Sequence, residues 1–155
     1  MKDDEFKELL TFGQEYEQLA KHYIDYDTIH YAEGKCSEYD FYTVTNNKKM
    51  KYEVKADTRA IHTGNMAIEY LARGQRSGLT ITEAKHYIYF VVTDGEPIVY
   101  LIPTRILRRA IRNKEYEIVI QTGYKQLSTV ALFKLSKFSE YIVYRTDGRQ
   151  DDNTV

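Results

Sequence analysis

Cysteine, proline and tryptophan are nearly absent: the 155 residues include one cysteine, two prolines and no tryptophan. The single cysteine, Cys36, excludes an internal disulfide and any zinc site built from cysteines, and it favours a reducing compartment. No apolar run approaches the roughly 20 residues that a membrane-spanning helix requires. The acidic, amphipathic start also differs from the basic and then apolar opening of a secretory signal. We therefore expect an intracellular protein without a membrane partner, either cytoplasmic or encoded by a virus or phage and acting in the host cell.

Several motifs that mark common enzyme classes are also missing. The sequence has no glycine-rich phosphate loop followed by Lys-Ser or Lys-Thr, no dinucleotide fingerprint and no His-Glu-x-x-His. Its four histidines are scattered without an obvious ligand spacing, so each is better explained as a surface or core histidine.

The composition is that of a folded domain with unevenly distributed charge. Hydrophobic residues make up 43 % of the chain and charged residues 29 %, which suits one domain with a buried core. We place this domain at residues 1–146 and expect a frayed tail at 147–155. Residues 1–40 contain four lysines and eleven acidic residues, a net charge of −7, whereas residues 41–155 carry +6. A solvated acidic face on the first helix is one explanation, and an interaction surface is the other.

The hydrophobic pattern predicts a mixed α/β fold. Apolar residues at three- and four-residue spacing predict a helix at 3–24. The Asn-Asn-Lys-Lys sequence at 46–49 suits a hairpin turn between two alternating segments. After the first helix, the expected elements are strands at 40–45, 50–56 and 66–71, a short helix at 82–86, strands at 87–92 and 98–102, and a basic helix from residue 103 to residue 113. Residues 116–121 and 131–135 are strands or helix pieces that the pattern does not place.

One group of charged residues stands out on the predicted hairpin. Asp40 starts the first strand, and Glu53-Val54-Lys55 ends the second. Residues two apart in a strand face the same side, so Glu53 and Lys55 project together while Val54 points into the core. If the strands pair, Asp40 and Glu53 form an oxygen-rich site for a hard divalent cation, with a lysine beside it. The alternative is an exposed cross-strand charge pair.

A further carboxylate is expected to join from the first helix. Glu17 lies next to the apolar face of that helix, where an acid is costly unless it meets a partner or a metal. Glu15 lies instead on the face expected to be wet. Glu17 is therefore the better candidate for the site, with a salt bridge at the helix edge as its alternative explanation.

These residues resemble the PD-(D/E)XK nuclease superfamily. The resemblance rests on Gly13-Gln-Glu-Tyr-Glu17-Gln-Leu-Ala20, Asp40 and Tyr52-Glu53-Val54-Lys55, and it covers about the first 60 % of the chain. Order and spacing are especially similar to archaeal Holliday-junction resolvases and related small nucleases. The resemblance implies a restriction-endonuclease-like α-β-β-β-α-β core with a mixed central sheet, followed here by a C-terminal extension. Tyr39 stands where the family's namesake proline precedes the aspartate, a substitution that many members share.

The resemblance also implies roles for individual residues. Asp40, Glu53 and the backbone carbonyl of Val54 would bind Mg²⁺, with Mn²⁺ as a substitute. Lys55 would position or activate the attacking water, and Glu17 would support the metal shell.

Three further residues are second-tier candidates. Glu69 lies on the inward-looking face of the strand at 66–71 and is expected to approach the metal from a neighbouring strand; an edge-strand charge is the alternative. Ser77 and Thr82 lie in a loop that leads to the predicted short helix, where hydroxyls and amides could hold a phosphate. A plain helix cap explains the same two residues.

Basic residues predict where nucleic acid would bind. Four arginines share one face of the helix after Pro103, a pattern that suits a phosphate backbone, although a solvated amphipathic helix explains it equally. The expected DNA-binding residues are Arg105, Arg108, Arg109 and Arg112 on that helix, Arg73 and Arg76 in a glycine-flanked loop, and Lys48 and Lys49 next to the proposed site.

The sequence thus favours a Mg²⁺-dependent DNA endonuclease of the junction-resolving, homing or restriction type. Its partner would be duplex or branched DNA. Cutting both strands requires two sites, so a homodimer or higher symmetric oligomer is expected. Two alternatives stay open: a non-catalytic nucleic-acid-binding module on the same fold, and an unrelated α/β interaction protein.

Overall fold

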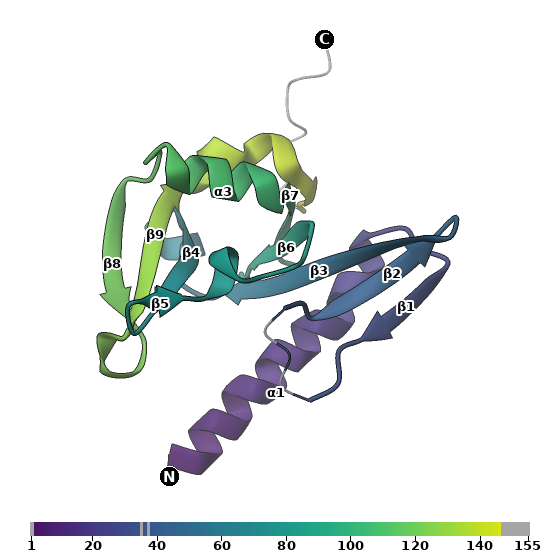
Figure 1. The fold of residues 1–155 in the computed structure, drawn as a ribbon, viewed down its shortest axis with the longest axis horizontal. Coiled ribbons are helices and arrows are strands. Elements are labelled where there is room, and N and C mark those ends of the chain that lie inside the picture. The colour runs from purple at the N-terminus through teal and green to yellow at the C-terminus, as the bar shows by residue number, and fades with distance from the viewer. Residues whose placement is uncertain (1, 35, 37, 147–155) are drawn as a thin grey trace.

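The chain folds into two β-sheets (Figure 1), and two hydrophobic cores lie one on each face of the larger sheet. The computed structural model describes residues 2–34, 36 and 38–146. The first sheet has six strands in the order β1-β2-β3-β6-β7-β10, and the second has four in the order β5-β4-β9-β8. The architecture is therefore α/β with a mixed central sheet. The tail expected at 147–155 lies outside the described residues.

The first sheet consists of an antiparallel meander joined to a second group of strands by one parallel pair. Strand β3 pairs with β6 in parallel, and every other pair in this sheet is antiparallel. The strands are β1 (Thr28–Tyr31), β2 (Phe41–Thr45), β3 (Lys48–Asp57), β6 (His86–Val91), β7 (Ile98–Pro103) and β10 (Ile142–Tyr144).

The hairpin between β2 and β3 follows the sequence prediction, with a tighter turn. Asn46 and Asn47 both have positive φ angles, 50° and 63°, which is the backbone of the two-residue turn that matches the twist of antiparallel strands. The register sets Thr45 opposite Lys48 and Phe41 opposite Tyr52. Strand β2 thus begins opposite Tyr52, and the segment just before it lies beside the second half of β3.

The two faces of the first sheet support different layers, because alternate residues of β6 point in opposite directions. Ile88 and Phe90 face helix α1 (Lys2–Ala20), and Tyr16 of that helix contacts Phe90 edge-on. Tyr87 and Tyr89 face the opposite way, towards the second sheet. A 3₁₀ turn, η1 (Lys21–Tyr23), completes the helical segment predicted at 3–24.

The second sheet and helix α3 (Thr104–Arg112) enclose the other core. Met66, Ile68 and Phe133 of the sheet are fully or almost fully buried there together with Leu107 of α3. The strands are β4 (Asn65–Ala72), β5 (Gln75–Arg76), β8 (Ile118–Thr122) and β9 (Ser128–Lys134). The short helical segments are α2 (Ala60–Thr63), η2 (Gly78–Thr80), η3 (Tyr124–Gln126) and η4 (Leu135–Tyr141).

Three sequence predictions of secondary structure need correction. No helix forms at 82–86; the helical turn is η2, and the chain then runs to β6 without helical structure. The connection before Glu38 contains strand β1, which its polar composition concealed. The strand predicted at 66–71 exists as β4 but belongs to the second sheet, because β6 occupies the place beside β3. The two unplaced segments are strands β8 and β9.

No helix among the described residues could cross a membrane.

Candidate active site

Four charged residues predicted from the sequence meet around the open flank of β3. Asp40 lies immediately before β2, and its backbone N–H donates to the Tyr52 carbonyl at 2.9 Å. Its carboxylate accepts a hydrogen bond of 2.7 Å from the backbone N–H of Val54. In a strand, the N–H and C=O of one residue point to the same side, so the Val54 carbonyl also faces the flank where Asp40 lies. The Asp40 carboxylate and the Val54 carbonyl, which is the predicted backbone ligand, therefore lie on the same flank of β3.

Glu53 and Lys55 project together from β3, as the two-residue repeat predicts. The Lys55 Nζ atom lies 3.8 Å from Oε1 of Glu53. The Glu53 side chain is only 13 % exposed, whereas that of Lys55 is 45 % exposed. The carboxylate is thus largely removed from water while the ammonium group can reach an incoming ligand.

Glu17 reaches the same place from α1. Burial raises the pKa of Glu17 to about 7, with the Asp40 carboxylate as the next cause, while Lys55 opposes the shift. The hydrogen bond between the two carboxyl groups adds to the increase in the pKa of Glu17. Glu15 is exposed on the same helix. The distinction between Glu17 and Glu15 made from helical spacing matches these positions.

The cluster carries more negative charge than its surroundings compensate. The pKa of Glu53 is raised to about 7, first by burial and then by the Asp40 charge, against the attraction of Lys55 and a hydrogen bond from Thr82. Burial also raises the pKa of Asp40, although the Val54 N–H and Lys55 lower it. A cation placed among these carboxylates would stabilise their charged forms and lower their pKa values.

The oxygen donors suit a hard divalent cation. Among the described residues, no group of three or more histidine, cysteine, aspartate or glutamate side chains is arranged to hold a metal ion. Mg²⁺ does not require such a cage, because it keeps several waters and binds one or two carboxylates together with substrate phosphates. Asp40, Glu53 and the Val54 carbonyl meet that requirement in number and chemistry.

Lys55 borders two hollows in the surface. A groove of about 780 Å³ lies between α1 and β3, with Phe12, Gly13 and Thr58 among its other lining residues. A smaller one of about 320 Å³ is lined by Lys55 together with Glu69 and Leu132 of the second sheet. A ligand can therefore approach this lysine from either side of β3.

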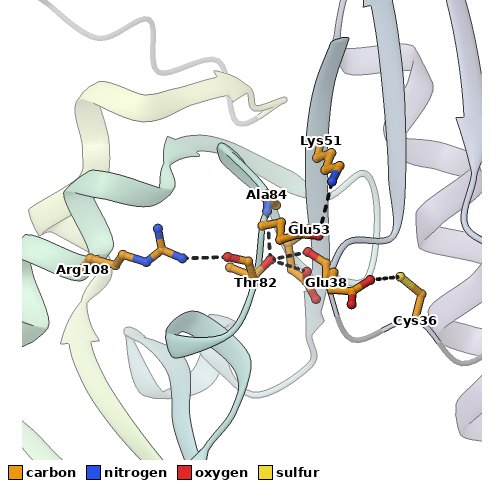
Figure 2. A network of polar contacts seen from close by, with 8 residues as sticks. Cys36, Glu38, Lys51, Glu53, Thr82, Ala84 and Arg108 are labelled. Carbon is orange, nitrogen blue, oxygen red and sulfur yellow. Dashed lines mark hydrogen bonds and ion pairs between the residues drawn. The ribbon is translucent and has the colours of Figure 1, made fainter.

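The second-tier candidates have internal hydrogen-bond partners. The Ser77 hydroxyl lies 3.1 Å from the Glu69 carboxylate, and no side-chain cap bond forms at the start of η2. Glu69 faces the site from the opposite sheet and not from a neighbouring strand, because β4 belongs to the second sheet. Thr82 is the most closely connected of the three: its hydroxyl lies 2.9 Å from Oε2 of Glu53 (Figure 2).

Some of the basic residues line two grooves beside the loop at 79–82. One groove, of about 430 Å³, is lined by Lys49, Lys51, Lys85 and Arg108 beside Thr82. The other, of about 520 Å³, is lined by Arg76, Arg108 and Arg112. Arg105, Arg109 and Arg73 are exposed elsewhere.

Lys48 and Lys49 lie farther from the acids than their sequence positions suggested. They begin β3 at the hairpin tip, so Lys49 is about 13 Å along the strand from Glu53 at 3.3 Å per residue. Lys49 lies on the same face of β3 as Glu53, with its ammonium group 4.0 Å from the centre of the Tyr42 ring.

Sequence reasoning did not single out Lys85, or the contact between Arg108 and the loop. The Lys85 N–H donates to the Lys51 carbonyl at 3.0 Å where β3 and β6 come together. Only the parallel pairing of two segments about 30 residues apart brings these lysines to one groove, and residue spacing carries no signal of that register.

Comparisons with family models, with curated proteins and with solved structures find no match to this chain.

Proposed function

We propose that this protein is a metal-dependent nuclease that hydrolyses phosphodiester bonds in DNA. The observation that carries the proposal is the convergence of Glu17, Asp40, Glu53 and Lys55 from three separate segments on one flank of β3. Perturbed carboxylates clustered in a cleft are typical of functional sites. A surface charge pair would not require a third and a fourth partner, nor carboxylates so far removed from water.

The roles of the residues follow from their chemistry. Asp40, Glu53 and the Val54 carbonyl would hold Mg²⁺ or Mn²⁺, and Glu17 would support them from α1. When bound, the cation would polarise the scissile phosphate and make a nearby water more acidic. Lys55 offers donors and no lone pair. It would therefore orient the attacking water and stabilise the negative charge that develops on the phosphate.

The order of elements is compatible with an α-β-β-β-α-β nuclease core. Helix α1 precedes three antiparallel strands, β1 to β3, and β6 then lies parallel to β3. In this assignment, the excursion at 58–85 through β4, β5 and η2 takes the place of the second helix. Residues after β6 would form the C-terminal extension.

The two grooves beside the loop at 79–82 suit a phosphate backbone. Lys49, Lys51 and Lys85 line the groove that borders Thr82, with Glu83 as the only acid among its lining residues. Clustered cations bind the phosphates of nucleic acids with little regard to base sequence. The arginines of α3, together with Arg73 and Arg76, are also proposed to contact the DNA backbone. Cleavage of both strands would use two copies of the site in a symmetric oligomer.

A cleavage panel tests the proposal. The protein is incubated with single-stranded, duplex, nicked and four-way DNA, with Mg²⁺, with Mn²⁺ and with EDTA. Nicking that disappears with EDTA supports the nuclease. Binding without cleavage would favour the non-catalytic module, and neither binding nor cleavage would favour the interaction protein. Asp40→Asn is the control against a contaminating nuclease, since it removes one ligand charge and keeps the shape of the side chain.

A further inference from the structure

The hydroxyl of Thr82 connects the two segments that carry the candidate metal ligands. It lies 2.9 Å from Oε2 of Glu53 and 3.0 Å from the backbone carbonyl of Glu38, two residues before Asp40. The Ala84 N–H donates to the same oxygen at 3.2 Å. Thr82 is only 4 % exposed. This hydroxyl is thus held from three sides, at the point where the Asp40 segment and β3 meet (Figure 2).

Arg108 holds the backbone of Thr82 from the other side. Its Nη2 donates to the Thr82 carbonyl at 2.7 Å, and its Nε donates to the Leu79 carbonyl at 3.2 Å. Figure 2 shows the guanidinium reaching Thr82 on the side opposite Glu53 and Glu38. Two donors of one planar group on two carbonyls leave the loop little freedom relative to α3.

The loop is also fixed to the second sheet. The Thr80 hydroxyl donates to the Tyr70 carbonyl at 2.8 Å. Gly78 packs so closely on β4 that a Cβ there would collide with the Glu69 carbonyl oxygen. Thr82 therefore presents its hydroxyl to Glu53 from a support anchored on both α3 and β4.

From these contacts we infer that Thr82 is a positioning residue that sets the separation of the Asp40 and Glu53 carboxylates, and that Arg108 acts on the site through Thr82. This inference rests on the proposed function. With Oε2 of Glu53 held by Thr82, Oε1 is left towards Lys55. Arg108 thereby has a role distinct from the phosphate contact expected of it and of its neighbours on α3.

The test compares Thr82→Val, which keeps the shape and removes the hydroxyl, with Thr82→Ser, which keeps the hydroxyl. The matched control is Thr104→Val, because Thr104 is also buried but its hydroxyl has no hydrogen-bond partner among the described residues. Mn²⁺ binding to the protein alone is measured by calorimetry, and single-turnover DNA cleavage is measured in parallel. Thermal unfolding reports whether each variant is folded.

Thr82→Val should lose 10- to 100-fold in Mn²⁺ affinity and in cleavage rate, the usual range for removing a partner that orients a metal ligand. Thr82→Ser should restore both, and Thr104→Val should behave as the wild type. Arg108→Ala should weaken Mn²⁺ binding without DNA present, an effect that a phosphate contact cannot produce. This second variant also carries the test if Thr82→Val does not fold.

Folded Thr82→Val with wild-type Mn²⁺ affinity and cleavage would overturn the role of Thr82. Arg108→Ala with wild-type Mn²⁺ affinity and weaker DNA binding would overturn the indirect role of Arg108. If the wild type neither binds Mn²⁺ nor cleaves any DNA, the proposed function itself fails, and the positioning role fails with it. Comparison with the wild type therefore separates the two kinds of failure.

Discussion

The carboxylate of Asp40 accepts a hydrogen bond of 2.7 Å from the backbone N–H of Val54, the residue between Glu53 and Lys55 in β3. This contact fixes Asp40 beside Glu53 and Lys55 even before a metal binds. Asp40 therefore has a structural role in addition to the metal-binding role proposed for it, and this determines how its variants should be designed.

Asp40→Asn should abolish cleavage and leave the fold intact. The amide oxygen still accepts from the Val54 N–H, but the ligand charge is lost. Asp40→Ala should also be inactive and should be less stable than Asp40→Asn by about 1–3 kcal/mol, because it leaves a buried N–H without a partner. Urea unfolding and a cleavage assay on both variants check this. Equal stability would show that the Val54 bond contributes little.

The pH dependence of stability should expose the crowded carboxylates. The pKa of Glu53 is raised from its ordinary 4.5 to about 7, so the folded state holds this proton more tightly than the unfolded state. Its destabilising effect is therefore absent below pH 4.5, grows between pH 4.5 and 7, and is complete above pH 7. Glu53→Gln should be more stable than the wild type by about 3 kcal/mol at pH 8 without metal, and equally stable at pH 4.

Unfolding in EDTA at several pH values measures this difference, and added Mg²⁺ should reduce it at pH 8. A difference that does not change with pH would mean that Glu53 ionises as it does in water.

Salt dependence should locate the DNA backbone. Replacing Lys49 and Lys85 with alanine should reduce the slope of log affinity against log salt by roughly 0.9 for each phosphate that the variant no longer neutralises. The double variant Arg105→Ala with Arg112→Ala, measured in Ca²⁺ under the same conditions, tests the face of α3 separately. A reduced slope for the arginine pair alone would place the DNA on α3 and away from the groove beside Thr82.

Gly78 should tolerate substitution far less than Gly74. Both have positive φ angles, 49° and 71°, which cost about 1–2 kcal/mol for a residue with a side chain. Gly74 has open space around it, whereas a Cβ on Gly78 would collide with the Glu69 carbonyl. Gly78→Ala should cost about 3 kcal/mol or more in unfolding free energy. Equal costs for the two variants would mean that the loop at 77–82 shifts easily.

The sequence patterns that succeeded are those determined by nearby residues. The hairpin of β2 and β3 needs only alternation and an Asn-Asn turn, so Asp40, Glu53 and Lys55 could be grouped before the structure was known. Helical spacing likewise separated Glu17 from Glu15. Each of these inferences depends on geometry within one element or one tight turn.

The features that could not be predicted depend on distant partners. Alternation at 66–71 indicates a strand but not its sheet, and β6 takes the place beside β3 through a parallel pairing. Strand β1 is short and polar, and its partner β2 makes it a strand. The contact between Thr82 and Glu53 spans 29 residues. Thr82 follows the turn η2, whereas the sequence pattern predicted a helix at 82–86.

Single-turnover DNA cleavage by the wild type and by Lys55→Ala, each with Mg²⁺ and with EDTA, tests the proposed nuclease activity and the role of Lys55 together. Lys55 holds no metal in this account, so Lys55→Ala should bind Ca²⁺ and DNA as the wild type does. Its cleavage should be slower by about two orders of magnitude or more, the scale for losing one preorganised electrostatic group. The wild type should cut with Mg²⁺ and not with EDTA. Cleavage that persists in EDTA, or wild-type cleavage by Lys55→Ala, would contradict the account.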